Sequence, residues 1–119
     1  QKVLLVIHAN HAREFDDEVG AALARLREVG SWVFNQAVLL AGVNDSEEAL
    51  AKLMEAGFAH GAMPYYLHLL DRVAGSAAFE VDEQRARELV TSLRRQLPGF
   101  LVPRLVRELS GVPFKVPVL

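Results

Sequence analysis

Hydrophobic positions along the chain follow two alternating patterns, short continuous runs and longer stripes at helical spacing. The continuous runs, rich in β-branched, aliphatic and aromatic residues, predict buried strands at residues 3–7, 32–40 and 63–70. A further run at 100–106 is interrupted by Pro103 and predicts a short or edge strand. Between the runs, apolar residues recur every three or four positions. These stripes predict helices over residues 15–29, 46–60 and 82–97.

Strands and helices therefore alternate, with a repeat of about thirty residues. Such units predict parallel strands joined by right-handed crossovers. We expect the strands to be neighbours in chain order, with the helices on one face only. The fold class is α/β, either a small open sheet or half of a (β/α) barrel. The start of the chain directly in a strand favours the second half of a barrel over residues 1–106, followed by a short irregular tail at 107–119.

The composition of the chain argues against several classes of function. The chain has 119 residues, enough for one domain with a modest core. Its net charge of −2, without a run of basic residues, argues against nucleic-acid binding. No apolar run is long enough for a membrane span and no signal-peptide pattern is present, so we expect a cytoplasmic protein. The absence of cysteine excludes a disulfide, a Cys-bound metal and a thiol nucleophile within these residues.

Polar residues at the predicted strand ends are candidates for chemistry, because parallel α/β sheets carry their active sites there. Three polar residues follow the first strand: His8, Asn10 and His11. Gln36 interrupts the second strand, and Asp71 follows the third. The two histidines fall in a turn, and nothing nearby completes a zinc site. Gln36 and its neighbour Asn35 need hydrogen-bond partners if buried, so a structural bond to a nearby loop is the alternative. Asp71 could equally be a solvated loop residue.

Lys115 stands in the tail between two hydrophobic residues, with a proline two residues away on each side. Such an apolar, conformationally restricted setting suits an amine of lowered pKa that forms a Schiff base. An ordinary tail lysine would have the same neighbours. The local sequence leaves both interpretations open.

Three stretches together resemble the lysine 2,3-aminomutase family. They are HANH at 8–11, NQAVLLAGVND at 35–45, and MPYYLH at 63–68 with Asp71. The resemblance runs the whole length of the chain in order, and its two long motifs, NQAVLLAGVND and PYYLHLLD, are specific. It implies a radical S-adenosylmethionine enzyme that also uses pyridoxal phosphate. It also implies that this segment is the C-terminal half of the family's radical-SAM-type partial (β/α) barrel, with the tail that carries the cofactor lysine.

The resemblance assigns three residues to the substrate and its covalent cofactor. Lys115 matches the lysine that holds pyridoxal 5′-phosphate and is the implied catalytic residue. Asp71 matches an acidic residue that receives the ε-ammonium group of the substrate, and Glu108 stands where the family has a second acid for the same purpose. Two carboxylates at one distal ammonium would reject shorter amino acids, whose charge would not reach them.

Three further residues are assigned less direct roles by the resemblance. His8 and Gln36 match positions near S-adenosylmethionine, and His68 replaces an aromatic residue near the pyridoxal ring. His68, Glu108 and the SGVPFK tail at 110–115 are similar to the family branch that acts on behalf of elongation factor P. That branch converts (S)-α-lysine to (R)-β-lysine, by radical 1,2-amino migration, for attachment to that factor.

The family also holds a [4Fe–4S] cluster on a CxxxCxxC loop, which this chain lacks. The resemblance therefore implies that the cluster ligands lie outside this chain, that it binds no metal itself, and that it is a fragment without turnover of its own. L-lysine is the implied small-molecule substrate, and a homo-oligomer is expected because the family tends to associate. Three alternatives stay open: a free-lysine aminomutase making β-lysine, a noncatalytic β/α interaction fragment, and an unrelated barrel enzyme.

Overall fold

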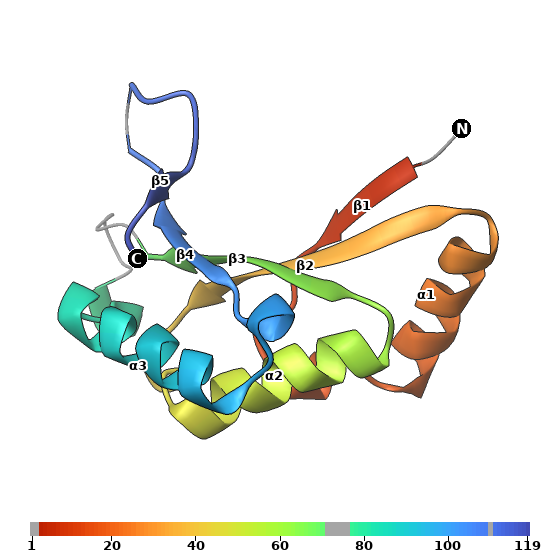
Figure 1. The fold of residues 1–119 in the computed structure, drawn as a ribbon, viewed down its shortest axis with the longest axis horizontal. Coiled ribbons are helices and arrows are strands. Elements are labelled where there is room, and N and C mark those ends of the chain that lie inside the picture. Colours follow the sequence, from red (N-terminus) through yellow and green to blue (C-terminus); the bar gives the residue numbers. More distant parts are fainter. Residues whose placement is uncertain (1–2, 71–76, 110) are drawn as a thin grey trace.

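The computed structural model describes residues 3–70, 77–109 and 111–119, and their strands form a single sheet (Figure 1). Its order is the chain order: β1 (Val3–Ile7), β2 (Ser31–Leu39), β3 (Met63–Leu69), β4 (Arg104–Arg107) and β5 (Val116–Pro117). The first four strands are parallel, and β5 is antiparallel to β4. The predicted α/β class, with parallel strands adjacent in chain order, is confirmed.

Three helices connect the parallel strands, and all lie on the same side of the sheet (Figure 1). They are α1 (Asp17–Glu28), α2 (Glu47–Ala59) and α3 (Glu83–Gln96), within two residues of the predicted bounds. Short 3-10 helices occur at η1 (Ala12–Glu14), η2 (Ala77–Phe79) and η3 (Gly99–Leu101). None of the helices in the described part of the chain is long and apolar enough to cross a membrane.

Each α-helix begins at a side chain that accepts a hydrogen bond from a backbone N–H of its first turn. Asp16 caps α1, Ser46 caps α2 and Asp82 caps α3. These caps bind N–H groups that have no partner within the helix and fix where each helix starts. The helices are thereby set against the sheet in a defined register.

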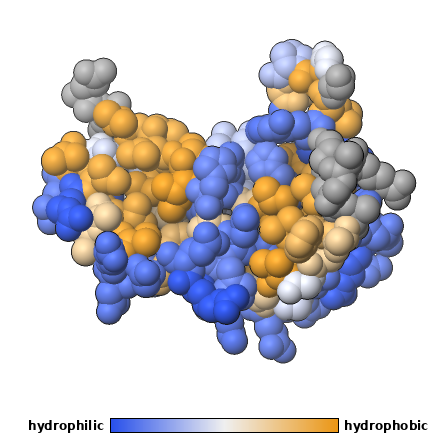
Figure 2. Space-filling model, turned by 180° about the vertical axis from the view of Figure 1, so that it is seen from behind, coloured by the Kyte–Doolittle hydropathy of each residue, from blue (hydrophilic) through white to orange (hydrophobic). Residues whose placement is uncertain are grey.

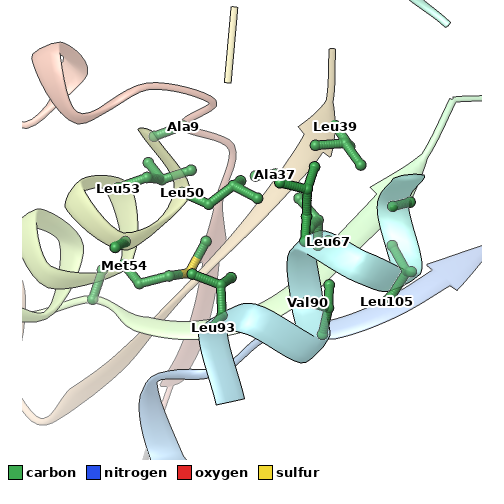
Figure 3. Close-up of a cluster of buried hydrophobic side chains, with 14 of the residues drawn as sticks. Ala9, Ala37, Leu39, Leu50, Leu53, Met54, Leu67, Val90, Leu93 and Leu105 are labelled. Atoms are coloured by element: carbon green, nitrogen blue, oxygen red, sulfur yellow. The ribbon is translucent and has the colours of Figure 1, made fainter. Parts of the chain in front are cut away.

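The core lies between the helices and the sheet (Figure 3). Alternate residues of β2 point into it, so Val33, Ala37 and Leu39 are buried, while Gln36 points to the opposite face. The largest fully buried side chains come from α2, α3 and strands β2 to β4: Leu39, Leu50, Leu53, Leu67, Leu89, Leu93 and Leu105. Because the helices cover one face only, the other face of the sheet, toward which Gln36 points, is not covered by a helix of the described chain.

The fourth strand is short, as predicted, but its bounds differ: β4 has four residues and begins at Arg104 rather than at residue 100. Phe100 lies in η3, and Pro103, which has no N–H to donate, precedes the strand. Of the two predicted possibilities, short or edge, the edge position does not hold, since β4 pairs with β3 on one side and β5 on the other. The tail, expected to be irregular, contributes the two-residue β5 to the sheet.

β1 forms the opposite edge and pairs with β2 alone among the described strands. Leu4 and Trp32 are register partners on these two strands, and both are more than half exposed. Figure 2, which views the molecule from behind, shows a large hydrophobic area on the side where Figure 1 places β1 and α1, and smaller ones on the other side. The strand at residues 3–7 was predicted to be buried, and this is wrong: its residues are exposed or half-buried, because β1 is an apolar edge strand with one strand partner in the described sheet.

Candidate functional site

His8 and Gln36 contact each other at the C-terminal end of β1. Ile7, the last residue of β1, is the register partner of Asn35, so His8 follows directly beside Gln36. The Gln36 Nε2 atom lies 3.3 Å from His8 Nδ1. The structure thus brings together the two residues that were predicted to lie near S-adenosylmethionine.

Three asparagines hold the loop that carries His8. Asn35 is buried, accepts a hydrogen bond from the Ala9 N–H at 2.8 Å and donates one to the Ala9 carbonyl at 3.1 Å. Asn10 accepts from the Val38 N–H at 2.9 Å. Asn44, also buried, donates to the Asn10 and Val38 carbonyls at 2.8 and 2.9 Å. The hydrogen-bond partner expected for a buried Asn35 is present.

The sequence placed Asn10 among the polar residues that follow the first strand, but the structural roles of Asn10 and Asn44 were missed. Asn44 stands in a turn after β2, where asparagine is common for its own local geometry, so it is not conspicuous. The available signal was that three asparagines follow or interrupt the first two strands. Their amides can each pair with a backbone N–H and carbonyl, which suits a loop clamped against a neighbouring strand.

A cavity of about 330 Å³ opens on the helix-free side at the ends of β1 to β4. Its walls contain four of the six predicted site residues, together with three hydrophobic side chains. The lining residues are His8, Gln36, Val38, His68, Leu69, Leu70 and Glu108. Asp71, predicted for the same place, lies outside the described residues.

Lys115 and Glu108 form an ion pair beside this cavity, between the Lys115 Nζ and Glu108 Oε1 atoms. The antiparallel pairing of β4 and β5, which form a hairpin, explains the contact. Arg107 is the register partner of Val116, so Lys115, the residue before Val116, lies opposite Glu108, the residue after Arg107. Glu108 also lines a second cavity of about 540 Å³, with Tyr66, Leu109, Val112, Pro113, Phe114 and Lys115. The two cavities therefore meet at Glu108.

The surroundings of Lys115 differ from the apolar setting that the sequence suggested. Its side chain is 28% exposed and rests against a carboxylate, because the hairpin brings an acid to a position seven residues away in sequence. The hydrogen bond and the charge of Lys115 lower the pKa of Glu108 below its ordinary value of 4.5, and the charge of His68 adds to this effect. Glu108 is therefore held as a carboxylate between two basic groups.

Tyr65 and Tyr66 stack on each other, with ring centroids 4.0 Å apart. Consecutive residues of a regular strand point to opposite faces. Here the pairing of β2 with β3 shifts between Asn35 and Ala37, which turns both rings to one side. The hydrogen bond and charge of Tyr66 raise the pKa of Tyr65 above 10.0. This irregularity, which places the Tyr66 ring at the second cavity, could not be predicted from the residue types.

His11, the second histidine of the turn, lies apart from this arrangement. Its Nδ1 accepts the Arg13 N–H at 3.1 Å and caps η1, while Glu14 accepts from the His11 N–H at 2.9 Å. Within the described ranges, no three His, Cys, Asp or Glu side chains gather closely enough to hold a metal ion. His11 thus has a local structural role.

The geometry defines a one-sided α/β domain with an acid–lysine pair and a histidine–glutamine pair at the C-terminal end of a parallel sheet. No protein-family model matches the chain. Curated relatives do: L-lysine 2,3-aminomutase of Escherichia coli is 48% identical over 117 residues, and those of Buchnera aphidicola and Haemophilus influenzae are each 40% identical over 115 and 114 residues.

These matches cover 98%, 97% and 96% of this chain, in the same order. The chain belongs to the lysine 2,3-aminomutase family, as its motifs predicted. It spans about a third of the length of these relatives, 34% in each case.

Proposed function

We propose that this chain is the part of an L-lysine 2,3-aminomutase that carries the cofactor lysine and the acids for the substrate's distal ammonium. The reaction would convert (S)-α-lysine to (R)-β-lysine, with elongation factor P as the destination of the product. The observation that carries the proposal is the ion pair of Lys115 with Glu108, which stands where two cavities meet at the strand ends. The identity to curated relatives of that name supports the same conclusion.

The second cavity suits a planar pyridine ring. Its walls are aromatic and apolar side chains, including Tyr66 and Phe114, and its one amine is that of Lys115. Aromatic side chains stack on flat rings, and a lysine amine is the group to which a carbonyl cofactor attaches. We therefore assign Lys115 to pyridoxal phosphate, with Tyr66 as a wall of the ring site and His68, 5.8 Å from the Tyr66 ring, near it. Bound there, pyridoxal phosphate supplies the electron-withdrawing system for amino migration.

His8 and Gln36 offer polar atoms to S-adenosylmethionine on the first cavity. The asparagine clamp fixes the backbone on both sides of His8, so these polar groups are set before a ligand arrives. The residues of this chain do not fit an iron–sulfur cluster, because such clusters are held by cysteine thiolates and the chain has none. The proposal therefore places the [4Fe–4S] ligands, and the other barrel half, in the remaining length that the relatives have.

The residues of this chain would bind and orient the lysine substrate. Glu108, kept ionised by Lys115 and His68, would receive the ε-ammonium of lysine together with Asp71. The hydrophobic side chains Val38, Leu69 and Leu70 line the same cavity, and can contact the methylene chain between the two ends of the substrate. An acid at a fixed distance from the reacting end selects the length of the amino acid as well as its charge.

The experiment is to locate the lysine that takes the cofactor. The chain has three lysines, Lys2, Lys52 and Lys115. In the complete enzyme, borohydride reduction in the presence of pyridoxal phosphate should place a stable pyridoxyl label on Lys115, found by peptide mass spectrometry. Lys115→Ala should lose the visible absorbance of the bound cofactor and nearly all turnover, whereas Lys52→Ala, on the exposed side of α2, should keep both. A label on another lysine, with an unchanged spectrum in Lys115→Ala, would overturn the assignment.

A further inference from the structure

The acid proposed to receive the substrate's ammonium is occupied, in this structure, by an ammonium of the chain itself. Glu108 Oε1 accepts from the Lys115 Nζ atom. A lysine side chain ends in the same group, a primary alkylammonium, as the lysine substrate. Lys115 thus presents to Glu108 the chemistry that the substrate would present.

We propose that Lys115 and an incoming alkylammonium compete for Glu108, so that Glu108 becomes a substrate site only when the Lys115 nitrogen is engaged elsewhere. This rests on the proposed function and deepens it: Glu108 would discriminate between amines only in the cofactor-loaded protein. Joining the Lys115 nitrogen to an aldehyde carbon releases one water, and the proton that the ammonium must first lose goes to solvent. The same event that fixes the cofactor then withdraws the resident ammonium from Glu108.

The small energy of an exposed ion pair favours an exchangeable contact between Lys115 and Glu108 over a permanent one. The Glu108 side chain is 63% exposed, and exposed ion pairs contribute little to stability because water and salt screen them. A ligand ammonium that buries its methylene chain in the first cavity has contacts that Lys115 lacks there. The contact between Lys115 and Glu108 is therefore easily broken once the Lys115 nitrogen is engaged elsewhere.

The charges around Glu108 disfavour binding of Lys115 and a ligand ammonium to its carboxylate at the same time. Glu108 has one negative charge and already faces the charges of Lys115 and His68. A third basic group at the same carboxylate would add like-charge repulsion without a new partner. An alkylammonium is thus expected to bind after Lys115 has left, rather than beside it.

The test uses a ligand that has the ammonium and nothing else of the substrate. n-Butylammonium is titrated into the cofactor-free protein while the side-chain carboxyl signal of Glu108 is followed by carbon-13 NMR at constant ionic strength. We expect Lys115→Met to bind n-butylammonium up to about fivefold more tightly than wild type, because its Glu108 has lost the competing charge of an exposed ion pair. Lys52→Met removes an equal charge elsewhere and should match wild type. Equal affinities in wild type and Lys115→Met, or no Glu108 response in either, would overturn the proposal.

A second readout does not depend on a lysine variant. Glu108→Gln keeps the shape of the side chain and removes its charge, so the Lys115 amine should react several-fold faster with an acylating reagent, measured relative to Lys52 in the same chain. An unchanged ratio would contradict the ion pair. The proposed function and the competition for Glu108 can be rejected separately. A pyridoxyl label on another lysine rejects the proposed function. The Glu108 titration and the acylation ratio alone decide whether Lys115 occupies Glu108.

Discussion

The side-chain amide of Asn35 pairs with both backbone polar groups of Ala9, at 2.8 and 3.1 Å, and so ties the end of β1 to β2. Asn35 is buried, so its removal leaves the Ala9 N–H and carbonyl without these partners. We predict that Asn35→Ala lowers the free energy of unfolding by roughly 2–4 kcal/mol, at about 1–2 kcal/mol for each lost bond. Urea unfolding measures the change.

Gln36→Ala is the matched control, because Gln36 is the next residue of β2 and points to the opposite face. It should change the free energy of unfolding by less than about 0.5 kcal/mol. Equal losses of stability in both variants would show that Asn35 is not a clamp.

The sequence predicted the strands and helices, whose hydrophobic residues recur at a regular spacing. It did not predict the side-chain contacts that depend on how strands pair across the sheet. The runs at 3–7 and 63–70 and the three helical stripes predicted strands and helices within two residues, because burial on one or both faces dictates their composition. The partner of Lys115 could not be predicted in this way. The pairing of β4 with the tail, which brings Glu108 opposite it, depends on a hairpin whose sequence lacks alternation.

The same limit applies to Tyr65 and Tyr66. Their residue types predicted a strand, but the register shift that stacks them depends on where β2 pairs with β3. His8 was expected at the carboxyl end of its strand and Gln36 within the neighbouring strand, and their contact follows from the parallel register of β1 and β2. Their predicted role near S-adenosylmethionine rests on the family resemblance and stays a prediction.

The hairpin of β4 and β5 should be sensitive to acid. Because Lys115 lowers the pKa of Glu108 in the folded chain, the ion pair stabilises the fold above the ordinary glutamate value of 4.5 and is lost as pH falls below it. Lys115→Met should raise the pKa of Glu108, measured by carbon-13 titration, and Lys52→Met should not. Added salt should weaken the effect, since Glu108 is exposed. A Glu108 titration that is the same in all three proteins would contradict the ion pair.

The open edge at β1 should cause this chain to self-associate. Leu4 and Trp32 are 61% and 55% exposed on neighbouring strands, and β1 has one strand partner in the described part of the sheet. Unpaired, apolar edges favour pairing with another copy. Sedimentation should show association that Leu4→Lys reduces. Val29→Lys, at a 75% exposed position after α1, should not reduce it. A compact, heat-resistant monomer in the unmodified chain would contradict the prediction.

The last prediction separates recognition of charge from recognition of length in the complete, cofactor-loaded enzyme. Norleucine has the carbon chain of lysine but no ε-ammonium. If Asp71 and Glu108 bind that ammonium, Asp71→Asn and Glu108→Gln should each weaken lysine binding by about tenfold to a hundredfold and leave norleucine binding nearly unchanged. The double variant should lose less than the sum of the two free energies, because both acids act on one group. The pyridoxyl label on Lys115 should persist in all three variants, since neither amide replaces the lysine. Equal losses for lysine and norleucine would mean that these residues shape the cavity instead, and would remove the two-acid basis for selecting lysine over shorter amino acids.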